Sequence, residues 1–469
     1  MRIPRIFPHW RRSFSFSDSV RPGIFLTCLL ATQILAIISR ASAQIIDFDA
    51  EPILYSSTPS VDRVASLARR LKSGQLHLPY DTERGYLPAL LKELGIAPSS
   101  QVLVFSKTSF QRDLIAPQTP RALYFNDDTY VGYVRYGEVL EFASVDPEQG
   151  SFFYTMSQDP ASPAGIVRRD AECLQCHASA LTKGVPGVFV RSVYSDASGQ
   201  PVLRAGTFLT DHTSPLKQRW GGWYVTGTHG SERHLGNSFL TDTAGVPEAF
   251  NPAPGANLID LKTRFSTTGY LSEHSDIVAL MVMEHQTQLH NLLTAANYQA
   301  RLALRDQVAI RELTKEPEGP LTEATRRRFD SAARPLLKYC LFVDETPLLS
   351  PIRGTSSFAE EFQARGPRDR KGRSLRELDL TYRLFRYPMT YLIYWDGFKK
   401  LPEVFRDHFY ERLRMILLGR DTGKDFARIP PEDREAVYEI LLETKEDLPE
   451  SWRSANAGKP VSSGARARL

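Results

Sequence analysis

The stretch of the sequence with the clearest chemical content is AECLQCHASA, residues 171–180. It holds two of the four cysteines in the chain, Cys173 and Cys176, and places His177 directly after the second one. Two thiols three residues apart, with an imidazole next to them, could attach a haem, contribute to a zinc site or form a redox dithiol. The spacing and the surrounding sequence separate these three possibilities.

The spacing fits covalent haem attachment best. Two thiols three residues apart can form thioethers to the two vinyl groups on one porphyrin edge, and the following imidazole is then held beneath the iron. The pentapeptide CLQCH resembles the attachment motif of c-type cytochromes, and the resemblance covers these five residues only. It implies that Cys173 and Cys176 are the thioether residues, that His177 is the proximal iron ligand, and that each chain carries one haem c.

The two other kinds of site have less support in the sequence. A structural zinc site needs four ligands, and the chain has no second CxxC pair to complete one. A thioredoxin-like dithiol needs a strand before the motif and a helix that opens on the first cysteine. The preceding residues, SPAGIVRRDAE, are polar and interrupted by proline, so we expect the motif to lie in a loop.

The N-terminal residues predict export. Five arginines precede an apolar run at 23–39, and Ala41-Ser42-Ala43 follows as a small-residue cleavage pattern, so residues 1–43 read as a cleaved signal peptide. The segment WRRSFSF at 10–16 resembles a twin-arginine signal, whereas haem attachment after export of an unfolded chain favours the general secretory route. We expect a periplasmic or secreted protein that is matured by the cytochrome c assembly machinery.

Charge and hydropathy limit the partners of the mature chain. The signal peptide carries six arginines and one aspartate, so the remainder is almost electrically balanced and has no basic excess for nucleic acid. No later segment is apolar for long enough to span a membrane, so we expect no transmembrane segment after cleavage. Cys340, in LLKYCLFV, is interpreted as a buried free thiol.

The hydrophobic patterns predict an α+β fold with a β-containing first half and a mainly helical second half. Two helices are expected at 61–74 and 83–95, then strands at 101–106, 121–125, 129–137, 138–145 and 151–157, and a hairpin from 187–194 and 202–209. A long helix is expected at about 272–307, with further helices at 321–338, 373–387, 401–418 and 431–445. The expected domains are a haem-binding region at 44–270, a helical region at 271–455 and a disordered tail at 456–469.

The second axial position of the iron is open to several residues. His229 and His234 lie in a segment rich in glycine and tryptophan, although a tight hairpin with surface histidines explains them as well. His285 and Met281 share the apolar face of the long helix, where a hydrogen-bonded core histidine is the simpler interpretation. Met389 reads as a core residue. A small molecule or water could also take this position.

Two functions therefore remain. The first is one-electron transfer between redox partner proteins through a haem whose two axial positions are both filled by protein. The alternative is a haem-dependent oxidoreductase with an open distal site for hydroxylamine, nitrite or peroxide, as in β-rich single-haem proteins of the cytochrome P460 type. The chain has no GxSxG, HExxH or Walker A sequence, so no other enzyme class is indicated.

Overall fold

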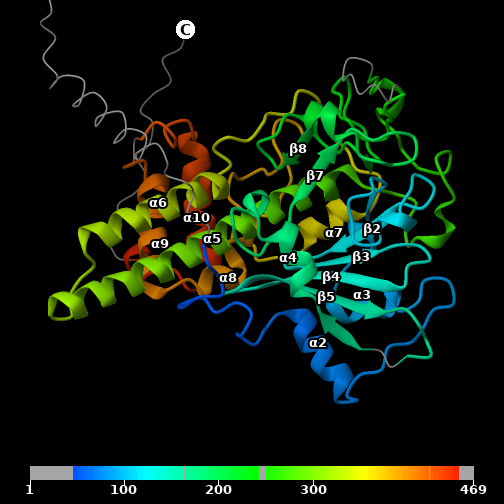
Figure 1. The fold of residues 1–469 in the computed structure, drawn as a ribbon. Helices are drawn as coiled ribbons and strands as arrows, with labels where there is room; N and C mark the ends of the chain where they lie inside the picture. Colours follow the sequence, from blue (N-terminus) through cyan, green and yellow to red (C-terminus); the bar gives the residue numbers. More distant parts are fainter. Residues whose placement is uncertain (1–45, 163–164, 242–249, 422, 454–469) are drawn as a thin grey trace, which may run out of the picture. The chain divides into compact units, whose positions relative to one another are not determined.

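The computed structural model describes residues 46–162, 165–241, 250–421 and 423–453 (Figure 1). All elements below belong to the unit that residues 47–469 form. The expected signal peptide and the expected tail at 456–469 lie outside the described residues. No helix among the described residues has the length and apolarity needed to cross a bilayer.

An antiparallel sheet of seven strands forms the centre of the first half of this unit. Its order is β6-β5-β4-β3-β2-β1-β9, so six sequential strands form a meander and β9 adds to the β1 edge. The bounds are β1 (Val102–Val104), β2 (Arg121–Phe125), β3 (Thr129–Tyr133), β4 (Val139–Asp146), β5 (Gly150–Ser157), β6 (Ile166–Arg168) and β9 (Trp223–Tyr224). The expected strands are confirmed, and a separate hairpin of β7 (Val190–Val193) and β8 (Thr207–Thr210) confirms the predicted pair.

The β2–β3 turn shows why these strands form a tight meander. The side chain of Asn126 accepts hydrogen bonds from the backbone N–H groups of Asp128 and Thr129, at 3.2 and 3.0 Å. When an asparagine side chain accepts hydrogen bonds from the backbone N–H groups two and three residues later, these local bonds stabilise a turn. The strands on either side then pair in register, with Leu123 opposite Gly132.

The two faces of the sheet have different neighbours. Successive side chains of a strand point to opposite faces, and in β5 Tyr154 bonds to Asp62, which caps helix α2 (Arg63–Lys72). The adjacent Phe153 points the other way. It is paired across the strands with Ala143, which is in turn paired with Tyr130. Helices α2 and α3 (Leu87–Leu94) contact strands of the sheet, and both confirm the expected pair of helices.

The second half is helical, which confirms the α+β class (Figure 1). The helices are α5 (Ile277–Thr314), α6 (Glu323–Cys340), α7 (Phe358–Ala364), α8 (Asp396–Lys399), α9 (Glu403–Leu417) and α10 (Pro431–Thr444). Helix α5 packs against α6 and also reaches the sheet, because Gln286 donates hydrogen bonds to the Asn126 carbonyl and the Tyr130 hydroxyl, both at 2.8 Å. This long helix therefore joins the two halves.

One expected helix is absent. Residues 373–387 form turns and the isolated bridge between Leu378 and Phe385 instead of a helix. The carboxylate of Asp379 accepts hydrogen bonds from the backbone N–H groups of Thr381 and Tyr382, at 2.9 and 2.7 Å. Such local bonds offer the backbone an alternative to the helical ladder, and the amphipathic pattern of this segment does not reveal them.

Candidate functional site

The three motif residues lie on one short helix, α4 (Asp170–His177), which follows β6 directly. The expectation of a loop is therefore wrong. Asp170 and Glu172 lie in the first helical turn, where acidic side chains interact favourably with the helix dipole. The helix packs against β5, and this contact places its C-terminal end, with His177, over the face of the sheet that carries Phe153.

The imidazole of His177 is held in one orientation. Its ring lies between Phe153 and Phe189, with ring centroids 4.8 and 5.1 Å away. Nδ1 is 2.8 Å from the carbonyl oxygen of Gly187, and a carbonyl can only accept, so Nδ1 carries the proton. Burial lowers the pKa of His177, which keeps the ring neutral and leaves the Nε2 lone pair for a ligand bond.

The two thiols differ in their surroundings. Cys173 is half-buried and Cys176 is exposed, and both are free. Burial, together with the negative charge of Glu141, raises the pKa of Cys173 to about 11. A redox dithiol needs a first cysteine with a lowered pKa, and helix α4 begins three residues before Cys173 rather than on it. These features disfavour a thioredoxin-like role.

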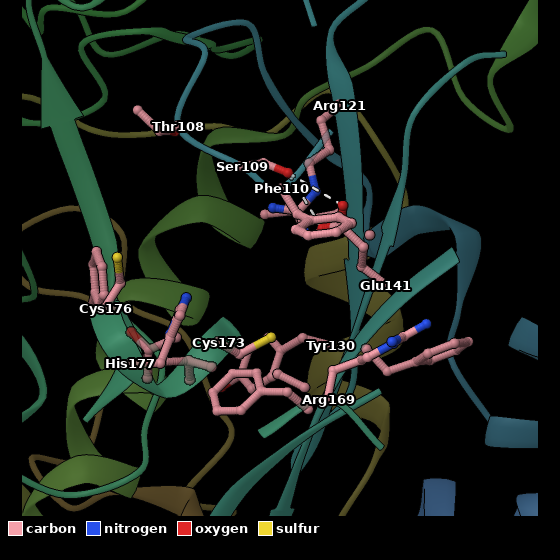
Figure 2. A pocket seen from close by; sticks show the side chains of 18 of the residues that line it. Thr108, Ser109, Phe110, Arg121, Tyr130, Glu141, Arg169, Cys173, Cys176 and His177 are labelled. Atoms are coloured by element: carbon pink, nitrogen blue, oxygen red, sulfur yellow. Dashed lines mark hydrogen bonds and ion pairs between the residues drawn. The ribbon is translucent and has the colours of Figure 1, made fainter. Parts of the chain in front are cut away.

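Cys173, Cys176 and His177 line one pocket of about 470 Å³ between α4, the sheet and β7 (Figure 2). This volume lies within the usual range for sites that bind small molecules or cofactors. Most of the wall is apolar or aromatic, and these side chains include Phe110, Leu123, Phe142, Phe153, Val188, Phe189, Val190, Trp223 and Met283. Such a wall suits a large, flat, apolar group.

A polar cluster forms another part of the wall. Arg121 of β2 forms a salt bridge with Glu141 of β4, and the side chains are 19% and 13% exposed. Glu141 also accepts hydrogen bonds from Gln111 at 2.9 Å and from Ser109 at 3.3 Å. Figure 2 shows Arg121, Glu141, Ser109 and Phe110 together, across the pocket from His177.

The charged side chains of the pocket do not balance. Lys107, Arg112, Arg121 and Arg169 are the cations of its lining, and Glu141 and Glu172 are the acids. Apart from Arg121, these cations form no salt bridge with any residue that the structure describes. The lining therefore carries two positive charges in excess.

The chemistry of these residues matches what a covalently attached haem requires. Two thiols and an imidazole with a free Nε2 face one space, the wall is apolar, and the excess charge is complementary to two carboxylates. Each feature corresponds to a part of a c-type haem: the vinyl groups, the iron, the porphyrin ring and the two propionates.

The candidate distal residues lie elsewhere. The rings of His229 and His234 are 4.7 Å apart, and neither residue lines the pocket. His229 accepts a hydrogen bond from the backbone of Asn257 at 3.1 Å, and His234 accepts one from Gly236 at 3.0 Å. Both are buried in an irregular segment, so the simpler interpretation of a tight hairpin with surface histidines is wrong.

His285 and Met281 are core residues of α5. His285 is fully buried, with Nδ1 2.8 Å from Nδ1 of His212 and Nε2 2.9 Å from the Thr390 hydroxyl. The interpretation as a hydrogen-bonded core histidine is confirmed, although the partners are side chains rather than backbone. Met281 does not line the pocket either, and Met389 is a core residue as expected.

Three residues of the pocket wall were not among the candidates from the sequence. Met283 lies on α5 two positions after Met281, and helix geometry alone does not show which of the two faces the motif. Arg121 and Glu141 belong to strands that the alternation pattern had located. The sheet register brings them together, because Gly132 of β3 is paired with Glu141 on one side and, on the other, with Leu123, two residues after Arg121.

Further searches add no ligand set and no relative. Within the described ranges, no three His, Cys, Asp or Glu side chains are grouped so that they could hold a metal ion by themselves. Comparison with protein-family models, with curated proteins and with solved structures finds no match.

Proposed function

We propose that this protein is an exported monohaem c-type cytochrome that acts in one-electron transfer. In this proposal the thiols of Cys173 and Cys176 would hold the haem through thioethers, and His177 Nε2 would bind its iron. The observation that carries the proposal is the His177 ring, whose Nδ1 is bonded to Gly187 and whose Nε2 is left for a pocket that both thiols line. A bound haem would supply a reversible one-electron couple.

The protein residues have defined tasks in this proposal. Phe153 and Phe189 hold the imidazole plane, and the Gly187 carbonyl makes Nε2 a better donor by accepting from Nδ1. The apolar wall excludes water, which influences the potential of a redox centre. The protein partners would be a redox protein and, during maturation, the cytochrome c assembly machinery.

The carrier function requires a second axial ligand from the protein. Met283 is the thioether side chain of the pocket lining, and it is buried, with 2% of its surface exposed. A methionine opposite a histidine is a common ligand pair in electron-transfer cytochromes. Of the five candidates, Met283 is the one that lines the pocket, so in this proposal it would be the protein's second iron ligand.

A second candidate function is a haem oxidoreductase with an open distal site. The observation that favours it is the composition of the wall: within the described part of the chain, His177 is the one histidine of the lining, and Arg121 and Glu141 stand across from it. A donor and an acceptor beside an open iron position would suit a small molecule such as hydroxylamine, nitrite or peroxide.

Covalent attachment is tested with the full chain, produced together with a cytochrome c maturation system. The wild-type protein should keep its colour through acid-acetone extraction and give a c-type pyridine haemochrome spectrum. Cys173→Ala and Cys176→Ala should each lose most of the covalent pigment, because each removes one thioether. Pigment that passes into the acetone would refute the proposal.

Cys340→Ala is the matched control for the cysteine variants. Its thiol is fully buried at the end of α6, away from the pocket. This variant should lose about 1–2 kcal/mol of unfolding free energy through a small cavity and keep a full complement of haem.

The spin state separates the two functions. A ferric spectrum that is low-spin, ignores cyanide and becomes high-spin in Met283→Ala would support the carrier. A high-spin wild-type spectrum with rapid cyanide binding would instead support the oxidoreductase.

A further inference from the structure

The guanidinium of Arg121 is only partly used by the protein. One terminal nitrogen, Nη2, donates to Glu141. No described residue accepts a hydrogen bond from Nε, which is buried, and none accepts from Nη1. Buried polar groups in proteins are nearly always satisfied. Nε lies against Gly132 and is shut off from the pocket, so Nη1 is the donor of this largely buried side chain that is left for an acceptor outside the chain.

The protein holds this guanidinium firmly in place. Arg121 lies across β3 at Gly132, where a Cβ atom would come within 2.7 Å of its Nε. Glu141 of β4, the strand beyond β3, holds the group and is itself held by Gln111 and Ser109. Glycine is thus required at position 132 to give the guanidinium room, and a group that is fixed beforehand loses little entropy on binding.

The charge of the pocket identifies the kind of acceptor. Glu141 neutralises Arg121, yet the lining as a whole has four cations and two acids. The net positive charge of the lining favours an anion over a neutral ligand, and Arg121 supplies the hydrogen bonds. A planar guanidinium matches the geometry of a carboxylate or a similar oxyanion.

We propose that Arg121 is an oxyanion-binding residue of the pocket, held in place by the positioning residues Gly132 and Glu141. This inference rests on the proposed haem function. The oxyanion could be a carboxylate of the haem itself or a free small anion such as nitrite or formate. Both sources share the same chemistry, and the experiment below distinguishes them.

The test uses haem-loaded full-length protein and three variants. Arg121→Gln removes the charge and the fork of donors. Gly132→Ala leaves the arginine in the chain but displaces its guanidinium. Arg169→Gln is the matched control, because it also removes one cation from the lining but from an exposed position. Covalent haem content and the melting temperature are measured first for every protein.

The first measurement is the affinity of the ferric protein for nitrite and for formate. Binding is monitored through the shift of the Soret band. If the anion is free, Arg121→Gln and Gly132→Ala should each raise Kd about ten- to a hundredfold, the range expected for a charge-assisted hydrogen bond. Arg169→Gln should change Kd by less than about threefold, because a solvent-exposed charge is screened.

The second measurement is the midpoint potential. If the anion is a haem carboxylate, Arg121→Gln and Gly132→Ala should lower the potential, because an unpaired carboxylate stabilises the ferric state, while nitrite and formate affinities stay unchanged. The proposal is overturned if both variants match the wild type in anion affinity and in potential. Failure of the haem proposal is recognised separately, since the wild type would then contain no covalent haem.

Discussion

His177 and His285 are two buried histidines with opposite roles in this fold. His177 has Nδ1 bonded to the Gly187 carbonyl and leaves Nε2 for a pocket lined by two thiols. His285 has both ring nitrogens occupied, by His212 and Thr390, inside an aromatic cluster. The comparison teaches that burial alone does not indicate a ligand. What matters is whether one nitrogen is fixed by the protein and the other is left over.

The surroundings of these histidines differ in the same way. Around His177, side chains from the sheet, α4, β7 and α5 line a pocket. Around His285, α5 and α6 pack directly, and Tyr339 and Phe342 stack on the ring at centroid distances of 5.3 and 4.5 Å. The β half therefore provides a binding space, and the helical half provides the main rigid support.

Substitution of His177 should give the largest effect. In His177→Ala we expect the yield of correctly ligated haem to fall at least about tenfold. Removing the hydrogen-bonding partner of a metal ligand typically lowers metal affinity about 10- to 100-fold, and removing the ligand itself should lower it at least as much. Haem per protein, measured from the pyridine haemochrome band, gives the result. A normal ferric spectrum in this variant would break the comparison, since His177 would then be dispensable.

His285→Ala should affect stability and spare the pigment. The substitution leaves a cavity and removes a partner from His212 and from Thr390, so the unfolding free energy should fall by about 2–4 kcal/mol. Urea unfolding measures this loss, and haem per folded protein should equal that of the wild type. Loss of the pigment in the folded variant would mean that His285 is the iron ligand after all.

His408→Ala provides the control for His285→Ala. His408 lies near the surface of α9, 3.1 Å from Asp330, and its side chain is 22% exposed. A partly exposed pair of this kind contributes about 0–1 kcal/mol. Its removal should therefore have a much smaller effect on urea unfolding.

A smaller, pH-dependent effect should come from Glu345 in the helical half. Burial raises the pKa of Glu345 from 4.5 to about 7. A raised pKa in the folded state means that folding favours the protonated acid, so its contribution to stability is full below pH 4.5 and is lost as the pH rises toward 7. Glutamine does not ionise, so Glu345→Gln should not lose stability as the pH rises. Its side chain can still accept the hydrogen bond from the backbone N–H of Leu384.

We therefore expect Glu345→Gln to match the wild type at pH 4 and to be about 1–3 kcal/mol more stable at pH 8. Urea unfolding at the two pH values measures the difference. An equal difference at both values would show that ionisation of Glu345 has no part in it.

Much of the secondary structure could be predicted from local patterns. The alternation of apolar residues located five of the six strands of the meander and missed β6, and Gly95 marked the end of α3, where it adopts a left-handed φ of 65°. The predicted helix at 373–387 failed because the side chain of Asp379 bonds to nearby backbone N–H groups, which competes with helix formation. Hydrophobic periodicity does not record such bonds.

The sequence by itself determined the thiol pair, the adjoining histidine and the α+β order of elements, because each of these depends on residues close together in the chain. Only the tertiary structure decided which residues face His177. The sheet register brings Arg121 and Glu141 together from different strands, and the packing of α5 presents Met283 rather than Met281 or His285. Such contacts depend on the twist and packing of elements that are far apart in sequence, and no local pattern encodes them.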